Sequence, residues 1–205
     1  MREAARSGNA QCATRLDDLP MLSAADLERV RARDPAALDL FFEALFDRTY
    51  GLLFRLTGNR TTAEDLAQET FLKIHRALHT LDPARDPWPW VVTIAMNVCR
   101  DHWGAVANRL QANSRSADDG AALGKLRDWR SSPEEATGDR EEAVLVQQAL
   151  GKVSEPARQI VLLHDWQGFS HDEIARMTGR THAAVRQQYS RALAALAKLL
   201  GTLRP

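Results

Sequence analysis

A group of side chains that can hydrogen-bond to the edges of DNA bases lies near the C-terminal end of this 205-residue chain. Positions three or four residues apart lie on the same face of a helix, so residues 186, 187, 190 and 191 would face outward together. Arginine can make paired hydrogen bonds to guanine, and glutamine to adenine, in the major groove of DNA. The pattern therefore predicts a DNA-reading helix whose contacts are Arg186, Gln187, Ser190 and Arg191.

The distribution of charge supports this interpretation. The whole chain has 27 basic and 27 acidic residues, so it is not a generally basic protein of the kind that coats nucleic acid. The stretch from Ile174 to Pro205 nevertheless contains no Asp or Glu. Its basic residues would attract phosphates, whereas the alternative is that they are merely solvated charges. They are Arg176, Arg180, Arg186, Arg191, Lys198 and Arg204.

Local signals around this helix predict a helix-turn-helix. Ser170 and Glu173 have the spacing of a capping box, which begins a short helix. Gly179 is expected to end that helix, and Thr181 is expected to cap the next one. The buried stripe of the second helix would consist of Val185, Tyr189, Ala192, Leu196 and Leu199.

The N-terminal half also has helical periodicity. Apolar residues recur at helical spacing between Leu38 and Leu56, and Gly58 is expected to end that helix. Thr61 or Thr62 is expected to cap the next helix. Ala67, Phe71, Ile74 and Leu78 would form the buried stripe of that helix. Another, mainly polar face of this helix consists of Asp65, Gln68, Glu69, Leu72 and Arg76. The alternative is that this face is an ordinary solvated surface.

A break rich in proline separates this helix from the next. Pro83, Pro87 and Pro89 lie in it, and helix is expected to resume near Trp90. One side of that helix would carry apolar residues from Val91 onward. The residues expected to point away from this side are Thr93, Asn97, Arg100 and Asp101.

These segments predict an all-α fold made of two small helical domains. We expect an N-terminal arm at residues 1–22, a helical domain at 23–104, a flexible linker at 105–138 and a second domain at 139–205. The linker is rich in Asn, Ser, Gly and Asp, which favours flexibility. The chain has no apolar run long enough to cross a membrane and no secretory signal, so we expect a cytoplasmic protein without membrane insertion.

No catalytic or metal-binding constellation stands out. His75 and His79 have a spacing that suits one face of a zinc site, but no third ligand is nearby. Cys12 and Cys99 make no disulfide framework. Cys99 is expected to be a small buried side chain, and Cys12 is a candidate redox sensor. We find no nucleophile–base pair and no phosphate-binding glycine loop, so we expect no enzyme activity and no cofactor.

Two stretches together resemble a known family. Residues 63–103, AEDLAQETFLKIHRALHTLDPARDPWPWVVTIAMNVCRDHW, are similar to region 2 of extracytoplasmic-function sigma factors of RNA polymerase, in the sigma-70 family. Residues 168–196, GFSHDEIARMTGRTHAAVRQQYSRALAAL, are similar to their region 4. The resemblance extends over about residues 24–104 and 139–200. It implies a region 2 helical bundle and a region 4 helix-turn-helix.

The resemblance implies partners for each surface. The polar face Asp65, Gln68, Glu69, Leu72 and Arg76 corresponds to the face that docks on the clamp coiled coil of core RNA polymerase, and region 4 to the part that meets the polymerase flap. It also implies control by an anti-sigma factor. The positions that match recognition of the promoter −10 element are Lys73, Trp88, Trp90, Asn97 and Arg100.

The region between residues 81 and 89 corresponds to the segment that takes a flipped non-template base. We expect Trp88 to stack on DNA and Trp90 to belong partly to the core. In region 4, the residues that correspond to recognition of the −35 element are Arg180, Thr181, His182, Arg186, Gln187, Ser190 and Arg191. The chain departs from the family pattern at Thr93, at Gln187–Gln188 and at PWPW. These departures affect what the resemblance implies about promoter sequence and strand opening, but not the family itself.

Two other functions fit the pattern less well. A helix-turn-helix regulator without polymerase would bind duplex DNA by itself, but the stretch at residues 64–73 has no role in it. A helical adaptor or an anti-sigma decoy that binds only proteins would not need an acid-free C-terminal tail. We therefore expect a transcription initiation factor, with the regulator as the alternative.

Overall fold

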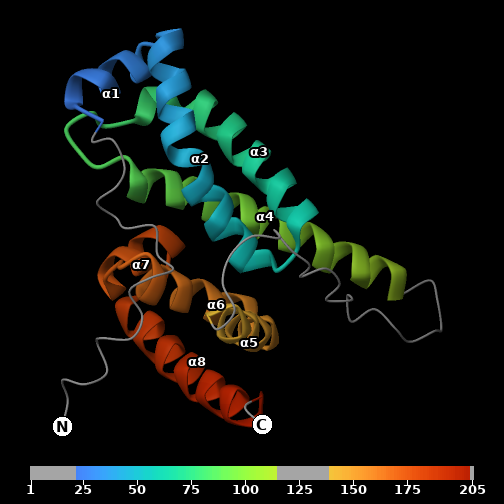
Figure 1. Cartoon of the computed structure of the whole chain (residues 1–205). Coiled ribbons are helices and arrows are strands. Elements are labelled where there is room, and N and C mark those ends of the chain that lie inside the picture. Colours follow the sequence, from blue (N-terminus) through green and yellow to red (C-terminus); the bar gives the residue numbers. More distant parts are fainter. Residues whose placement is uncertain (1–21, 115–138, 204–205) are drawn as a thin grey trace, which may run out of the picture.

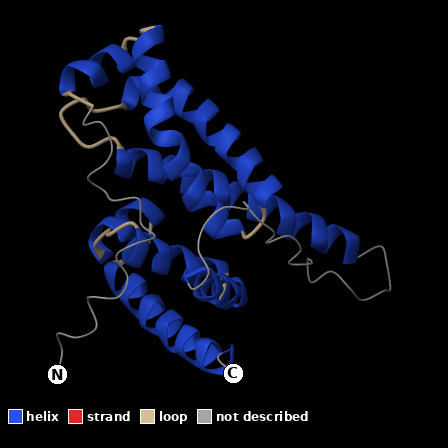
Figure 2. Ribbon diagram, viewed as in Figure 1, coloured by secondary structure: helices blue, strands red, loops and turns tan. Residues whose placement is uncertain are grey.

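The described part of the chain is helical throughout. The computed structural model describes residues 22–114 and 139–203, and these form helices and short connecting loops without a strand (Figures 1 and 2). The all-α expectation is therefore confirmed. Residues 1–21, with Cys12, and most of the predicted linker lie outside the described residues.

The helices form two groups that follow the order of the sequence. The first group contains α1 (Ala24–Arg31), α2 (Pro35–Thr57), α3 (Arg60–Ala77), the 3₁₀ turn η1 (Leu78–Thr80) and α4 (Trp88–Ser114). The second contains α5 (Asp139–Lys152), α6 (Glu155–Val161), the π turn η2 (Leu162–Trp166), α7 (His171–Thr178) and α8 (His182–Leu203). We call these groups the first half and the second half. Helix α4 continues ten residues past the predicted boundary at residue 104, to Ser114.

The turn between α2 and α3 places these two helices against each other. Gly58 ends α2 in the left-handed conformation, with φ 65°, and its N–H donates to the Phe54 carbonyl at 2.8 Å. Asn59, the next residue, then caps α3 by accepting a hydrogen bond from the Thr62 N–H at 2.9 Å. The predicted caps Thr61 and Thr62 were wrong because Asn59 is already in position to start the helix directly after the glycine.

The core of the first half lies where α2, α3 and α4 meet. Phe41, Leu53, Ile74 and Val91 are fully buried there. Phe71, which was expected in the buried stripe, is only half-buried. It packs instead beside α2, with ring centroids 5.5 Å from Phe42 and 5.7 Å from Phe46.

The second half contains the predicted helix-turn-helix. The capping box is complete: the Ser170 hydroxyl accepts from the Glu173 N–H, and the Glu173 carboxylate accepts from the Ser170 N–H. Gly179 ends α7 with φ 67°. The Thr181 hydroxyl accepts a hydrogen bond from the Ala184 N–H at 3.2 Å at the start of α8. These three signals are local, which explains why the sequence predicts this motif well.

The two halves touch each other, although the sequence predicted nothing about a contact between them. The C-terminal end of α2 meets α5 and α6, and α4 packs beside α7 (Figure 1). The Trp88 indole N–H donates to the Gln167 side-chain oxygen at 3.1 Å across this contact.

We predict that Asn59→Ala lowers the free energy of unfolding by about 1 kcal/mol, because it leaves an amide at the start of α3 without its partner. The measurement is urea unfolding followed by circular dichroism. Thr61→Ala is the matched control, since Thr61 is exposed and was the cap expected from the sequence. An equal loss in both variants would contradict the assignment of Asn59 as the cap.

Candidate functional site

Helix α8 has one buried and one exposed face. Val185 and Ala192 are buried, with exposed fractions of 0% and 2%. Arg186, Gln187, Ser190 and Arg191, which were predicted to read DNA, are all exposed on the other side. The structure thus brings these four side chains together on one free surface of a helix, which has the width needed to enter a major groove.

The start of α8 is engaged partly within the protein. Thr181 and His182 are exposed, but Arg180 is half-buried and its guanidinium donates to the Gln188 side-chain oxygen at 2.7 Å. His182 lies 3.8 Å from an Asp172 carboxylate oxygen. Arg180 is therefore oriented by the protein, whereas Arg186 and Arg191 are exposed.

A polar cluster packs against helix α8. The rings of His164 and His171 stack with centroids 4.4 Å apart, and Tyr189 lies 4.7 Å from His164. The Tyr189 hydroxyl donates to Asp165 at 2.6 Å. Burial, followed by this hydrogen bond, raises the pKa of Tyr189. The His171 Nε2 atom is buried and has no hydrogen-bond partner. His164 and His171 thus form one cluster with Tyr189 of α8.

The polar face predicted on α3 is exposed as a unit. Asp65, Gln68, Glu69, Leu72 and Arg76 all lie on the surface, and Leu72 is 58% exposed. Phe46 of the adjacent helix α2 is 46% exposed and stacks on Phe71. A large apolar side chain surrounded by charged and amide groups is a composition found at protein–protein interfaces. This surface can therefore bind another protein.

Three of the predicted −10 residues lie at the α3–α4 junction or on α4. The Lys73 ammonium is 2.9 Å from an Asp101 carboxylate oxygen and 3.2 Å from one of Glu69. The hydrogen bond to Asp101 raises the pKa of Lys73. Asn97 and Arg100 are exposed and hydrogen-bonded to each other. Lys73 is thus held by two carboxylates, while Asn97 and Arg100 form a polar pair on the surface of α4.

Of the two tryptophans, Trp88 differs from the expectation and Trp90 is partly core, as expected. Trp88 is buried, with an exposed fraction of 3%, so in this arrangement it cannot stack on a base. The guanidinium of Arg48 lies 3.8 Å from the centre of the Trp88 ring. Trp90 is half-buried, and its indole N–H donates to the Thr80 hydroxyl at 3.1 Å. Of the two, Trp90 is the more accessible.

Asp86 explains why helix α4 begins at Trp88 and not near Trp90 as expected. Its carboxylate accepts a hydrogen bond from the Trp88 N–H at 2.9 Å, so helix α4 already begins at Trp88. Proline is tolerated in the first helical turn because its missing N–H would be unpaired there anyway. Pro89 therefore lies in the first turn of α4 and not in the proline-rich break. The signal was an aspartate two residues before Trp88, the first residue of the helix.

Other chemical groups give no second site. Among residues 22–114 and 139–203, no group of three His, Cys, Asp or Glu side chains could hold a metal ion. His75 is half-buried, and a ring nitrogen of the exposed His79 lies 3.2 Å from the Arg76 carbonyl. Cys99 is buried, as expected, and burial raises the pKa of its thiol to about 12. None of the described helices is long and apolar enough to cross a membrane.

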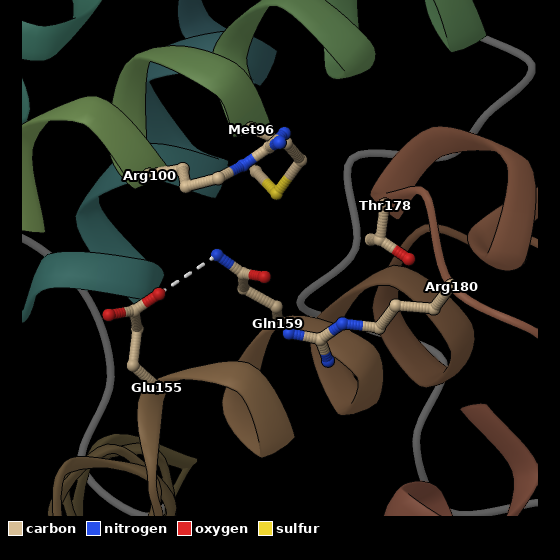
Figure 3. A pocket seen from close by; sticks show the side chains of 6 residues that line it. All are labelled: Met96, Arg100, Glu155, Gln159, Thr178 and Arg180. Atoms are coloured by element: carbon tan, nitrogen blue, oxygen red, sulfur yellow. Dashed lines mark hydrogen bonds between the residues drawn. The ribbon is translucent and has the colours of Figure 1, made fainter. Parts of the chain in front are cut away.

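A small cavity of about 90 Å³ lies between the halves (Figure 3). Met96 and Arg100 of α4 line one side of it. Glu155 and Gln159 of α6 lie opposite, hydrogen-bonded to each other at 3.2 Å. Burial raises the pKa of Glu155. Thr178 and Arg180 complete the lining. The cavity thus borders a helix that carries predicted −10 residues.

Comparison with known proteins gives a consistent result for both halves. Residues 41–109 match the family described as Sigma-70 region 2, and residues 143–196 match Sigma-70, region 4. Together the two matches cover more than half of the chain. The order of the matches along the chain is that expected from the sequence.

Curated relatives are similar over most of the chain. The chain is 32% identical to the RNA polymerase sigma factor CarQ of Myxococcus xanthus, over 86% of this chain and 97% of CarQ. It is 29% identical to the ECF RNA polymerase sigma factor BldN of Streptomyces coelicolor, over 85% of this chain but 64% of BldN. The solved sigma factor RpoE of Bartonella quintana, in complex with the anti-sigma factor NepR, has a TM-score of 0.63 at 18% identity, covering 80% of this chain and 96% of RpoE. The last likeness is one of fold.

The histidine cluster predicts that the stability of the second half depends on pH. Burial, followed by the neighbouring His164, His182 and Arg186, lowers the pKa of His171 below its ordinary value of 6.5. The unfolded chain therefore binds a proton at His171 more readily than the folded chain. The second half should lose stability as the pH falls below about 6.5, and the loss should level off below the folded pKa.

The measurement is native-state hydrogen exchange of the α7 and α8 amides between pH 5 and 7.5, converted to opening free energies. His171→Phe should flatten the dependence, because phenylalanine keeps the ring without a titrating nitrogen. His79→Phe, in the first half, is the matched control. An unchanged slope in His171→Phe would show that His171 is not the group responsible.

Proposed function

Because this chain belongs to the sigma-70 family, as a sigma factor of the extracytoplasmic-function type, we propose that it binds core RNA polymerase, directs it to specific promoters and promotes opening of the DNA strands. As a sigma factor it is a transcription initiation factor. The observation that carries the proposal is that one chain exposes both the mixed polar and apolar face of α3, which we assign to protein docking, and the polar face of α8, which we assign to DNA reading.

The polymerase contact is assigned to α3. Its exposed face combines the carboxylates of Asp65 and Glu69 with Gln68, Arg76 and the apolar side chain of Leu72. We assign this face to the clamp coiled coil of core polymerase, and the second half to the flap. The exposed apolar side chains of Leu72 and Phe46 support a protein partner, because removing apolar surface from water stabilises a complex by about 25 cal/mol per Å².

The DNA contacts are divided between the halves. Residues 139–205 act as region 4 and read the −35 element through the exposed face of α8. Residues 23–104 act as region 2 and recognise the −10 element. Lys73, Trp90, Asn97 and Arg100 are accessible or partly accessible for this role in the structure, whereas Trp88 requires the halves to separate first.

The remaining assignments follow from this role. The protein needs no cofactor and catalyses no reaction of its own, since RNA synthesis belongs to the polymerase, and it acts in the cytoplasm. A protein antagonist is a further partner: RpoE of Bartonella quintana was solved with the anti-sigma factor NepR, and we assign an anti-sigma factor to this chain as well.

The alternative is a helix-turn-helix regulator that binds DNA without polymerase. It would leave the exposed Leu72 and Phe46 without a partner. It also predicts tight binding of duplex DNA by the free protein, which co-elution with polymerase and a duplex-binding assay together would reveal.

We predict that the double variant Asp65→Ala/Gln68→Ala weakens binding of core RNA polymerase by at least about tenfold, as expected when two interface side chains are truncated. Co-elution and titration with purified bacterial core polymerase measure this. Asp39→Ala/Gln148→Ala removes the same two side-chain types at exposed positions elsewhere and should bind normally. Wild-type protein that does not bind core polymerase would overturn the proposed function.

We predict that Arg186→Ala and Arg191→Ala each reduce promoter binding by the holoenzyme by about 10- to 100-fold, because each removes contacts in the major groove. Binding of core polymerase should be unchanged. The measurement uses promoter fragments selected by the wild-type holoenzyme. Lys198→Ala, which removes an exposed basic side chain on the same helix, should have a smaller effect. Loss of polymerase binding in either arginine variant would refute the division of roles.

A further inference from the structure

Two neighbouring residues in the middle of helix α8 are held by side chains from outside that helix. The Gln188 side-chain oxygen accepts a hydrogen bond from the Arg180 guanidinium at 2.7 Å. The Tyr189 hydroxyl donates to an Asp165 carboxylate oxygen at 2.6 Å. Arg180 lies in the turn that precedes α8, and Asp165 lies in η2, which directly follows α6. Both hydrogen bonds therefore connect α8 to other elements of the second half.

The two held residues lie between the side chains that are proposed to read DNA. Along the chain they separate the exposed pair at residues 186–187 from the exposed pair at residues 190–191. Gln188 and Tyr189 themselves are half-buried. The hydrogen bonds thus act on α8 at the level of its reading side chains and not at a distant end of the helix.

These hydrogen bonds restrict α8 in a way that its apolar contacts do not. Val185 and Ala192 are buried and keep the helix against the domain, but apolar burial is not directional, whereas hydrogen bonds depend on angle as well as distance. An α-helix with its side chains has a radius of about 5–6 Å, so a rotation of about 10° moves a side-chain tip by about 1 Å. Such a shift disturbs the paired hydrogen bonds by which Arg and Gln distinguish bases.

The Tyr189 contact is itself well supported. The Tyr189 ring lies 4.7 Å from the ring of His164 and 5.1 Å from the ring of His171, measured between centroids. These two rings fix the orientation of the tyrosine side chain. Burial, followed by the hydrogen bond to Asp165, raises the pKa of Tyr189, so its hydroxyl remains a donor at neutral pH.

The Arg180 contact is supported from α6. Arg180 is half-buried and lines the small cavity beside Gln159, toward which its side chain points (Figure 3). The Arg180 charge also attracts the carboxylate of Glu155, on the same helix. Its guanidinium is therefore placed between α6 and Gln188, where it can hold α8.

We propose that Asp165 and Arg180 are positioning residues for promoter reading, which fix the rotation of α8 through Tyr189 and Gln188 and so determine how selectively it reads the −35 element. The proposal rests on the function proposed above. Asp165 was not among the site residues expected from the sequence, and Arg180, which was expected to contact DNA, acts here through Gln188. General affinity for DNA depends mainly on phosphate contacts and is less sensitive to the rotation of the helix.

The test measures the selectivity of the holoenzyme formed by the full-length chain and core RNA polymerase. Its affinity for promoter fragments selected by the wild type is divided by its affinity for fragments with a scrambled −35 element, at fixed salt. Tyr189→Phe keeps the ring but removes the hydroxyl, and should lower this ratio by about three- to tenfold. Tyr50→Phe, which changes the chain's other tyrosine, on α2, is the matched control and should keep the wild-type ratio.

The carboxylate side of the same hydrogen bond gives an independent variant. Asp165→Ala removes an exposed negative charge, so it should bind all DNA more tightly, but its selectivity ratio should fall as in Tyr189→Phe. The double variant should be no less selective than Asp165→Ala, because both changes remove one bond. Asp165→Asn keeps an acceptor oxygen and should recover part of the ratio.

The Arg180 side of the proposal is tested with Gln188→Ala, with Gln148→Ala at an exposed position of α5 as the control. Fragments with single base-pair changes in the −35 element then separate positioning from direct contact. Loss of a direct contact relaxes discrimination at one base pair. A rotated helix relaxes it at several base pairs together, and this is the result expected for Gln188→Ala and Tyr189→Phe.

Three results would overturn the positioning role: an unchanged ratio in the variants, relaxation at a single base pair, or additive losses in the double variant. Circular dichroism checks the folding of each variant, and the exposed Asp165 provides the test if Tyr189→Phe is unstable. Failure of the wild type to bind core polymerase or to select promoter fragments would instead refute the proposed function, and the positioning role with it.

Discussion

The unpaired carbonyls at the C-terminal end of α2 are the constraint around which the two halves are arranged. Within α2 the Phe54 carbonyl is satisfied by the Gly58 N–H, which requires the left-handed conformation that glycine adopts at low cost. The next two carbonyls, of Arg55 and Leu56, are satisfied by Gln147 and Arg158 from the second half. The C-terminal end of α2, which would otherwise face water, is therefore a contact site between the two halves.

The candidate binding surfaces differ in whether they are exposed while the two halves are in contact. The α3 face with Asp65 and Gln68 and the α8 face with Arg186 and Arg191 are exposed while the halves are together. Trp88 and Met96 of α4 are buried. A partner that recognises α3 or α8 can therefore approach the protein as it stands, whereas recognition through Trp88 competes with its hydrogen bond to Gln167.

Sequence reasoning succeeded where structure is decided locally. The capping box at Ser170, the glycine at 179 and the alternation of faces along α8 depend on residues within one or two turns, so the helix-turn-helix and its exposed side chains were predictable. It failed where the deciding partner is distant in sequence. Trp88 is buried and donates a hydrogen bond to Gln167, and Arg158 donates to the Leu56 carbonyl. No local sequence pattern predicts these contacts. Asn59 and Asp86 could have been recognised as helix caps, but the neighbouring threonines and prolines gave more conspicuous signals.

The separation of faces on α8 has a consequence for evolution. Val185 and Ala192 hold the helix in place, while Arg186, Gln187, Ser190 and Arg191 lie on its exposed side. Surface substitutions away from special backbone features usually change stability by less than about 0.5 kcal/mol. The reading face can therefore diversify after gene duplication almost independently of the fold, so that copies of this chain acquire new target genes while the scaffold stays the same.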